Sequence, residues 1–143
     1  MDKKPINVLL VDDDDVAAEG VMRSLKKHDI DCMLVHAEDG VEALDILKME
    51  HPDKHIASPF LVLLDLNMPR MDGFEFLSTI RSDPALQNLV VFVLTTSSAD
   101  ADLNRAYQES IAGYMVKSAV GPQFSKLMNL LKTYGDAVSL PSK

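Results

Sequence analysis

Short runs of apolar residues recur along the chain, and most of them end at acidic or hydroxyl residues. The three strongest runs are Ile6–Val11, Phe60–Leu66 and Val90–Thr95, and two weaker ones are Cys32–Ala37 and Gly113–Lys117. These runs are apolar at successive positions rather than at alternate ones. We therefore expect strands that are buried on both faces, which is typical of a parallel sheet.

Between these runs, apolar residues recur at the three- and four-residue spacing of helices. The helical positions are, in chain order, Ala17, Val21 and Leu25; Val41, Leu44 and Leu47; Phe74, Leu77 and Ile80; Leu103, Ala106, Tyr107 and Ser110; and Phe124, Leu127, Met128, Leu131 and Tyr134. Asp14 or Asp15 is placed to cap the first helix, and Pro122 to begin the fifth. Five strands that alternate with five helices predict an α/β fold with a doubly wound parallel sheet.

Length and charge narrow the class of protein. The 143 residues fit one domain, which we place at residues 1–134, followed by a C-terminal tail at residues 135–143. A net charge of −8 argues against binding to nucleic acid or to an anionic membrane surface. No apolar run approaches the roughly 20 residues that span a bilayer, so we expect a cytoplasmic protein. Cys32 is the single cysteine, which excludes an intrachain disulfide.

Polar side chains gather where the predicted strands end. Asp12 and Asp13 follow the first strand, Asp65 and Asn67 stand at the end of the third, Thr95 ends the fourth and Lys117 ends the fifth. In a doubly wound sheet, ligands bind at the carboxyl ends of the strands. An oxygen-rich donor set suits Mg²⁺ better than zinc. No glycine-rich phosphate loop follows the first strand, which disfavours nucleotide binding.

A simpler explanation exists for each carboxylate taken alone. Helix capping accounts for Asp14 and Asp15, and an Asx turn is common at positions such as Asp65. One cap does not need four carboxylates, however, so capping explains Asp12 and Asp13 poorly. Their expected position beside Asp65 favours a functional cluster.

Two motifs and their spacing carry a family resemblance. Val-Asp-Asp stands at 11–13 and LLDLNMPRMDG at 63–73, and the hydroxyl of Thr95 and the amine of Lys117 follow in order. In these features the chain resembles the receiver domain of two-component response regulators, whose fold is flavodoxin-like. Within that family it is most similar to the stand-alone regulators paired with bacterial phytochromes. It shares with them the Leu-Thr-Thr-Ser run at 94–97, the long loop before the third strand and Ser118 after the lysine.

The resemblance implies a reaction and a set of residues. A histidine kinase would transfer a phosphoryl group to Asp65 in a Mg²⁺-dependent reaction, assisted by Thr95 and Lys117. Asp13, Asp65 and the main-chain carbonyl of Asn67 would bind Mg²⁺, and Asp12 would act largely through water. Thr95 and Tyr114 would couple phosphorylation to a conformational switch. The domain would be a phosphoacceptor rather than a turnover enzyme.

The resemblance also suggests partners. We expect a phytochrome-like histidine kinase to dock on the first helix, where Val16 and Met22 lie beside or off the apolar stripe. We also expect a homodimer through the fourth helix, fifth strand and fifth helix, where Leu130 lies off the stripe and is predicted to be exposed. Two alternatives stay open: a Mg²⁺-dependent phosphatase or hydrolase with an aspartate nucleophile, and a pseudo-receiver that binds partners without being phosphorylated.

Overall fold

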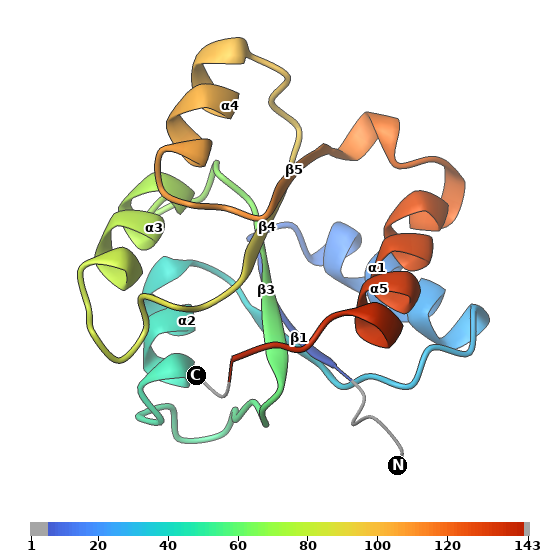
Figure 1. Cartoon of the computed structure of the whole chain (residues 1–143), viewed down its shortest axis with the longest axis horizontal. Helices are drawn as coiled ribbons and strands as arrows, with labels where there is room; N and C mark the ends of the chain where they lie inside the picture. Colours follow the sequence, from blue (N-terminus) through green and yellow to red (C-terminus); the bar gives the residue numbers. More distant parts are fainter. Residues whose placement is uncertain (1–5, 142–143) are drawn as a thin grey trace.

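A computed structural model describes residues 6–141, which form one five-stranded parallel sheet with helices on both faces (Figure 1). The strands are β1 (Asn7–Val11), β2 (Leu34–Ala37), β3 (Phe60–Leu64), β4 (Val91–Thr95) and β5 (Gly113–Val116). The helices are α1 (Asp15–Lys27), α2 (Gly40–Leu47), α3 (Gly73–Arg81), α4 (Asp100–Tyr107) and α5 (Ser125–Ala137). The strand order β2-β1-β3-β4-β5 confirms the predicted doubly wound, flavodoxin-like fold.

The sheet separates two hydrophobic cores. Helices α1 and α5 cover one face, and α2, α3 and α4 cover the other (Figure 1). Every residue of β3 and β4 is buried, whereas every residue of the edge strand β5 is only half-buried. Burial on both faces explains why the central strands are continuously apolar in the sequence. Across residues 6–141, no helix combines the length and apolar character needed to cross a membrane.

Aspartates cap the amino ends of three of the helices. The carboxylate of Asp14 accepts the amide N–H groups of Val16 and Ala17 at the start of α1, which settles the choice between Asp14 and Asp15. Asp39 and Asp72 cap α2 and α3 in the same way. Each cap satisfies amide donors that the first helical turn leaves without partners.

The start of α5 differs from the prediction. Pro122–Phe124 form a short 3₁₀ turn, and the α-helix begins only at Ser125. Gln123 and Phe124 have φ angles of 56° and 55°, in the left-handed region, which interrupts the helix. The Phe124 ring packs closely on Gly20 of α1: a Cβ on Gly20 would lie 2.8 Å from a carbon of that ring. Packing between the two helices therefore accompanies this break.

The fourth helix is shorter than its apolar pattern suggests. It ends at Tyr107, and Ser110, the last predicted position, has a φ of 59°. The Arg81 guanidinium donates hydrogen bonds to the main-chain carbonyls of Glu109, at 2.7 Å, and Ser110, at 3.1 Å. These carbonyls are thus held by an arginine of α3 instead of continuing the helical ladder.

The end of α5 also departs from expectation. The helix continues to Ala137, so the first residues of the predicted tail are helical. Tyr134 packs edge-on against Phe92 with 5.2 Å between ring centroids, which anchors this last part of the helix. Leu130 is partly buried against the core between the sheet and α1 and α5, so the prediction that it is exposed is wrong. The face of α5 that contacts the core is therefore wider than the apolar stripe that helical periodicity predicts.

Candidate functional site

The main chain carries two carboxylates to the same edge of the sheet. The amide of Asp12 donates to the Ala37 carbonyl at 3.0 Å, and that of Asp65 donates to the Val11 carbonyl at 2.9 Å. These bonds continue the strand ladders one residue beyond β1 and β3. Both side chains are buried, while that of Asp13 is exposed. Carboxylate oxygens of Asp12, Asp13 and Asp65 lie within 4.8 Å of one another.

An ammonium and a hydroxyl border these carboxylates. The Lys117 Nζ lies 2.7 Å from Asp12 Oδ2 and 3.9 Å from Asp65 Oδ2. The buried Thr95 hydroxyl donates to Asp65 Oδ1 at 2.8 Å. Residues from the ends of four strands, far apart in the sequence, therefore meet around Asp65. The sequence places six polar residues at the ends of β1, β3, β4 and β5, and the structure brings five of them together. The sixth, Asn67, belongs to the adjoining loop.

Burial and charge act in opposite directions on Asp12. Desolvation raises its pKa above the ordinary value, and the nearby Asp65 charge adds to this rise. The hydrogen bonds from Lys117 and from the amide of Asp14, together with the positive charge of Lys117, oppose the rise without cancelling it. A buried carboxylate beside another one is costly to ionise. The cluster therefore favours the approach of further positive charge.

The loop after β3 shapes the other side of Asp65. The Asn67 amide lies 3.4 Å from Asp65 Oδ1, at the long end of hydrogen-bond distances, and the Asn67 side chain is exposed. Gly73 begins α3, and its amide donates to the Leu66 carbonyl at 3.0 Å. A Cβ on Gly73 would lie 2.5 Å from the Asp65 carbonyl oxygen, so the main chains pass in direct contact here.

Tyr114 connects β5 to the loop after β4. Its hydroxyl donates to the Ser97 carbonyl at 2.9 Å, and the Ser97 hydroxyl donates to Asp102 of α4 at 2.6 Å. Burial raises the pKa of Tyr114, so its hydroxyl stays protonated and can donate. Tyr114 thus holds the loop that follows Thr95. At the end of β5, the peptide between Lys117 and Ser118 is trans; the cis peptide within the described residues is Ser58–Pro59.

Sequence reasoning missed a group of contacts beside the acidic cluster. The His36 ring lies 2.6 Å from the Asp12 carbonyl oxygen, and the loop before β3 reaches this point through Lys54. At the start of α2, the capping residue Asp39 pairs with the Arg70 side chain of the loop after β3 at 2.7 Å. Arg70 lies within the motif at 63–73, but that motif does not predict its contact with Asp39. The signal for the other contacts was the polar His36 near the end of an apolar run.

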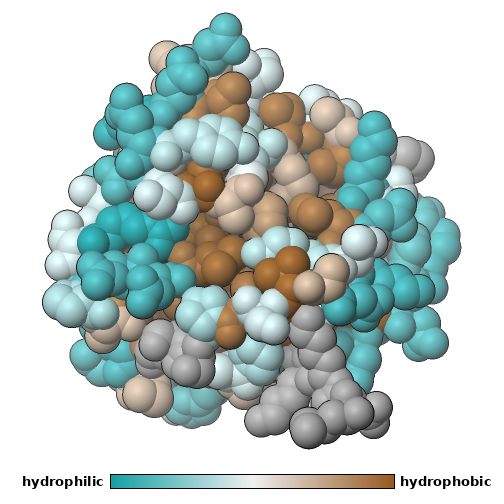
Figure 2. All heavy atoms as spheres, viewed as in Figure 1, coloured by the Kyte–Doolittle hydropathy of each residue, from teal (hydrophilic) through white to brown (hydrophobic). Residues whose placement is uncertain are grey.

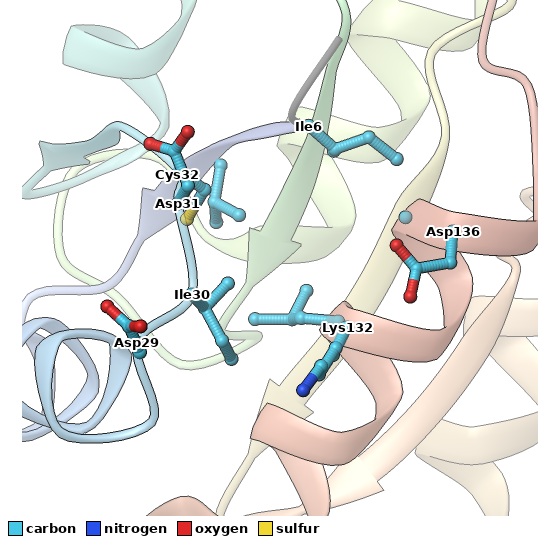
Figure 3. A pocket seen from close by; sticks show the side chains of 10 residues that line it. Ile6, Asp29, Ile30, Asp31, Cys32, Lys132 and Asp136 are labelled. Carbon is cyan, nitrogen blue, oxygen red and sulfur yellow. The ribbon is translucent and has the colours of Figure 1, made fainter. Parts of the chain in front are cut away.

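A cavity in the described residues lies away from these carboxylates. It has a volume of about 310 Å³ and is lined at the amino ends of β1 and β2 and along the second half of α5 (Figure 3). Ile6, Ile30 and Cys32 line one side of it, and Lys132 and Asp136 line another. The acidic cluster, in contrast, lies at the carboxyl ends of the strands.

Known proteins share both the sequence pattern and the fold. The chain is 35% identical over 130 residues to the probable methanogenesis regulatory protein FilR2 of Methanothrix harundinacea, covering 91% of this chain and 83% of that protein. It is 32% identical over 139 residues to the response regulator Rcp1 of Synechocystis, covering 96% of this chain and 95% of Rcp1.

Solved structures agree with these sequence relatives. The Mn²⁺-bound form of Rcp1 matches with a TM-score of 0.81 and 31% identity, covering 96% of this chain and 99% of that one. The phosphorylated cyanobacterial phytochrome response regulator RcpA matches with a TM-score of 0.80 and 30% identity, covering 97% and 100%. The family model of the response regulator receiver domain matches residues 8–131. The chain therefore belongs to the response regulator receiver family.

Proposed function

We propose that this protein is a single-domain response regulator that accepts a phosphoryl group from a histidine kinase onto Asp65. The observation that carries the proposal is the environment of Asp65, whose carboxylate lies 2.8 Å from the Thr95 hydroxyl and 3.9 Å from the Lys117 ammonium. Phosphoryl transfer passes through a loose transition state with charge on the equatorial oxygens. A positioned ammonium and hydroxyl can stabilise that charge.

The transfer requires only a nucleophile and charge stabilisation from the receiver. An oxygen of Asp65 forms the new bond to phosphorus as the phosphorus–nitrogen bond of the kinase phosphohistidine breaks. The electron pair of the broken bond stays on the imidazole. Lys117 and Thr95 then bind two of the phosphoryl oxygens, as a point charge and as a hydroxyl donor. In this role the domain is a phosphoacceptor rather than a turnover enzyme.

Mg²⁺ is the proposed metal of the site, and the donor set fits it. Asp13, Asp65 and the main-chain carbonyl of Asn67 would bind the ion, and Asp12 would contact it through water. These donors are all oxygens, which Mg²⁺ prefers. Three carboxylates and Lys117 leave two negative charges, which a divalent ion balances. When bound, the ion neutralises charge on the transferring group; the Mn²⁺ reported in the Rcp1 structure supports a divalent metal.

Thr95 and Tyr114 are the proposed switch. If Thr95 turns from Asp65 toward a phosphoryl oxygen, the loop that contains Ser97 moves with it. The hydrogen bond from Tyr114 to the Ser97 carbonyl then links that movement to β5. The phosphoryl group would shift the population between two arrangements of this surface.

The acceptor assignment is tested with acetyl phosphate, Mg²⁺ and intact mass spectrometry. We expect the protein to gain one phosphoryl group, and the gain to disappear in Asp65→Asn or when a chelator removes the metal. Asp45→Asn is the matched control, because Asp45 is an exposed aspartate of α2 outside the cluster. Labelling of Asp65→Asn at the rate of the unsubstituted protein would show that Asp65 is not the acceptor.

A histidine kinase is the proposed upstream partner, with α1 as its docking helix. Val16 and Met22 of α1 have relative exposures of 79% and 40%, which leaves apolar surface free beside the acidic cluster. Val16→Asp should slow transfer from the cognate kinase and leave labelling by acetyl phosphate unchanged. Equal losses in both assays would indicate a defect of the site and would exclude docking at Val16.

We also propose a homodimer through α4, β5 and α5. Apolar side chains gather over β5 between α4 and α5 (Figure 2), and each residue of β5 is half-buried. Tyr107 of α4 is 49% exposed and replaces Leu130 as the residue to test. Tyr107→Glu should shift the protein from dimer to monomer and so lower its sedimentation coefficient. Met49 is 75% exposed and lies outside this face, so Met49→Glu should leave the coefficient unchanged. A monomer at all concentrations, with and without beryllofluoride, would exclude the dimer.

A further inference from the structure

Two residues at the end of β2 bond to the main chain of Asp12, one to its amide and one to its carbonyl. Its amide donates to the Ala37 carbonyl at 3.0 Å, and its carbonyl lies 2.6 Å from the His36 Nε2. A carbonyl oxygen only accepts hydrogen bonds, so the His36 Nε2 carries the proton and donates it. This bond joins residues 24 positions apart on neighbouring strands. It differs from the bond of His28, whose ring contacts the Ser24 carbonyl of its own helix at 2.9 Å.

The Asp12 carbonyl has a special position because it belongs to the peptide that joins Asp12 to Asp13. That peptide is planar, so a hydrogen bond to its oxygen restricts the orientation of the plane that carries the Cα atoms of both Asp12 and Asp13. The Asp12 carboxylate is further held by Lys117 and by the amide of Asp14 at 2.9 Å. The exposed Asp13 carboxylate accepts no hydrogen bond from the described residues, so this peptide is the held group nearest to it.

A second layer of contacts supports His36. The Lys54 ammonium donates to the His36 carbonyl at 2.8 Å and lies 3.4 Å from both carboxylate oxygens of Glu42. The His51 Nε2 lies 3.1 Å from Glu42, and its Nδ1 accepts the amides of Asp53 and Lys54. The loop between α2 and β3 is therefore tied to the end of β2 by side chains that converge on Glu42.

We propose that His36 is a positioning residue that sets the geometry of the acidic pair Asp12–Asp13 for metal binding, and that Lys54 of the loop before β3 supports it. The proposal rests on the function proposed above, because it assumes that the acidic pair binds a divalent ion. Groups that orient metal ligands commonly change affinity by 10- to 100-fold when they are removed. His36 acts through the main chain and touches neither the metal nor the phosphoryl group.

A pair of amide variants tests the role of His36. Gln at position 36 places its amide nitrogen near the position of the histidine Nε2 and can still donate, whereas the shorter Asn cannot reach. We expect His36→Asn to weaken Mg²⁺ binding about 10-fold in calorimetric titrations of the full chain. His36→Gln should bind nearly as the unsubstituted protein does, and His28→Asn is the matched control. Equal affinity of the Asn and Gln variants, or an equal loss in His28→Asn, would overturn the proposal.

The support from Lys54 is tested by a double-mutant cycle. Lys54→Met should weaken Mg²⁺ binding less than His36→Asn does, and the double variant should be no weaker than His36→Asn alone. Losses that add would show that Lys54 does not act through His36. Hydrogen exchange of the Asp14 amide in metal-free protein gives a second readout, which His36→Asn should accelerate and His36→Gln should not.

The experiment separates the two levels of the argument. If the unsubstituted protein binds no Mg²⁺, the metal site itself is wrong and the inference falls with it. If it binds Mg²⁺ and the His36 variants bind equally well, the proposed function stands and only the positioning role is excluded. Urea unfolding of each variant shows whether a change in affinity follows a loss of folded protein.

Discussion

Gly73 should be far less tolerant of a methyl group than Gly40, although the two glycines occupy equivalent positions. Each is the first residue of a helix, directly after a capping aspartate. A Cβ on Gly73 would lie 2.5 Å from the Asp65 carbonyl oxygen and 2.7 Å from the Leu66 Cα. A Cβ on Gly40 would meet the Met71 Cγ at 2.8 Å and its Sδ at 2.9 Å. A methionine side chain can rotate away, whereas main chain in a buried loop cannot.

This difference sets the expected magnitude. Overpacking in a tightly packed region costs about 1–3 kcal/mol, and the higher helix propensity of Ala regains at most about 1 kcal/mol. We therefore expect Gly73→Ala to lower the free energy of unfolding by about 2 kcal/mol, and Gly40→Ala to change it by less than about 1 kcal/mol. Because the clash falls on the main chain of Asp65, Gly73→Ala should also slow labelling by acetyl phosphate.

Urea unfolding followed by circular dichroism measures both variants, and the change in melting temperature is a second measure. A loss of 2 kcal/mol corresponds to roughly 4–8 °C for a chain of this size. If Gly73→Ala unfolds at the same urea concentration as the unsubstituted protein, the loop moves more freely than the contacts imply. If Gly40→Ala loses as much as Gly73→Ala, main-chain contact is not the deciding difference.

Three further predictions concern other parts of the molecule. Arg81 donates to four main-chain carbonyls, so Arg81→Met should cost about 2–3 kcal/mol in urea unfolding, whereas Arg23→Met, at an exposed ion pair, should cost less than about 0.5 kcal/mol. Burial alone would raise the pKa of Asp39, but the Arg70 and main-chain hydrogen bonds lower it. This stabilisation is present above the unfolded-state pKa of about 4 and is lost as the pH falls through the lower folded-state pKa, so the urea midpoints of Arg70→Met and the unsubstituted protein should differ at pH 6 and converge once the pH is below that folded-state pKa. Burial, with a smaller effect of the Asp31 charge, raises the pKa of the Cys32 thiol to about 11, so at pH 8 a disulfide reagent should react roughly 100-fold more slowly with the folded protein than with the urea-unfolded chain; equal rates would contradict this burial.

The sheet and the acidic cluster were predictable because each rests on patterns within short segments. Continuous apolar runs identify buried parallel strands, and the residue after such a strand falls at the carboxyl edge of the sheet. Asp12, Asp65 and Thr95 could thus be placed together without any knowledge of their contacts. The helix ends were less predictable, since the left-handed Phe124 coincides with close packing on Gly20, more than a hundred residues away. Helical periodicity cannot report such a contact.

The contacts of His36 show a more general reason why part of the site was hidden. A pair of side chains leaves a trace at both positions, because each residue type must suit the other, as Asp12 and Lys117 do. A side chain that binds the main chain leaves a trace at only one position, since every residue has a carbonyl. The bonds from His36 to Asp12, from Lys54 to His36 and from Tyr114 to Ser97 are all of this second kind. The side chains proposed for the phosphoryl chemistry can therefore be predicted from residue types, whereas the side chains proposed to orient them are recognised only once the fold is known.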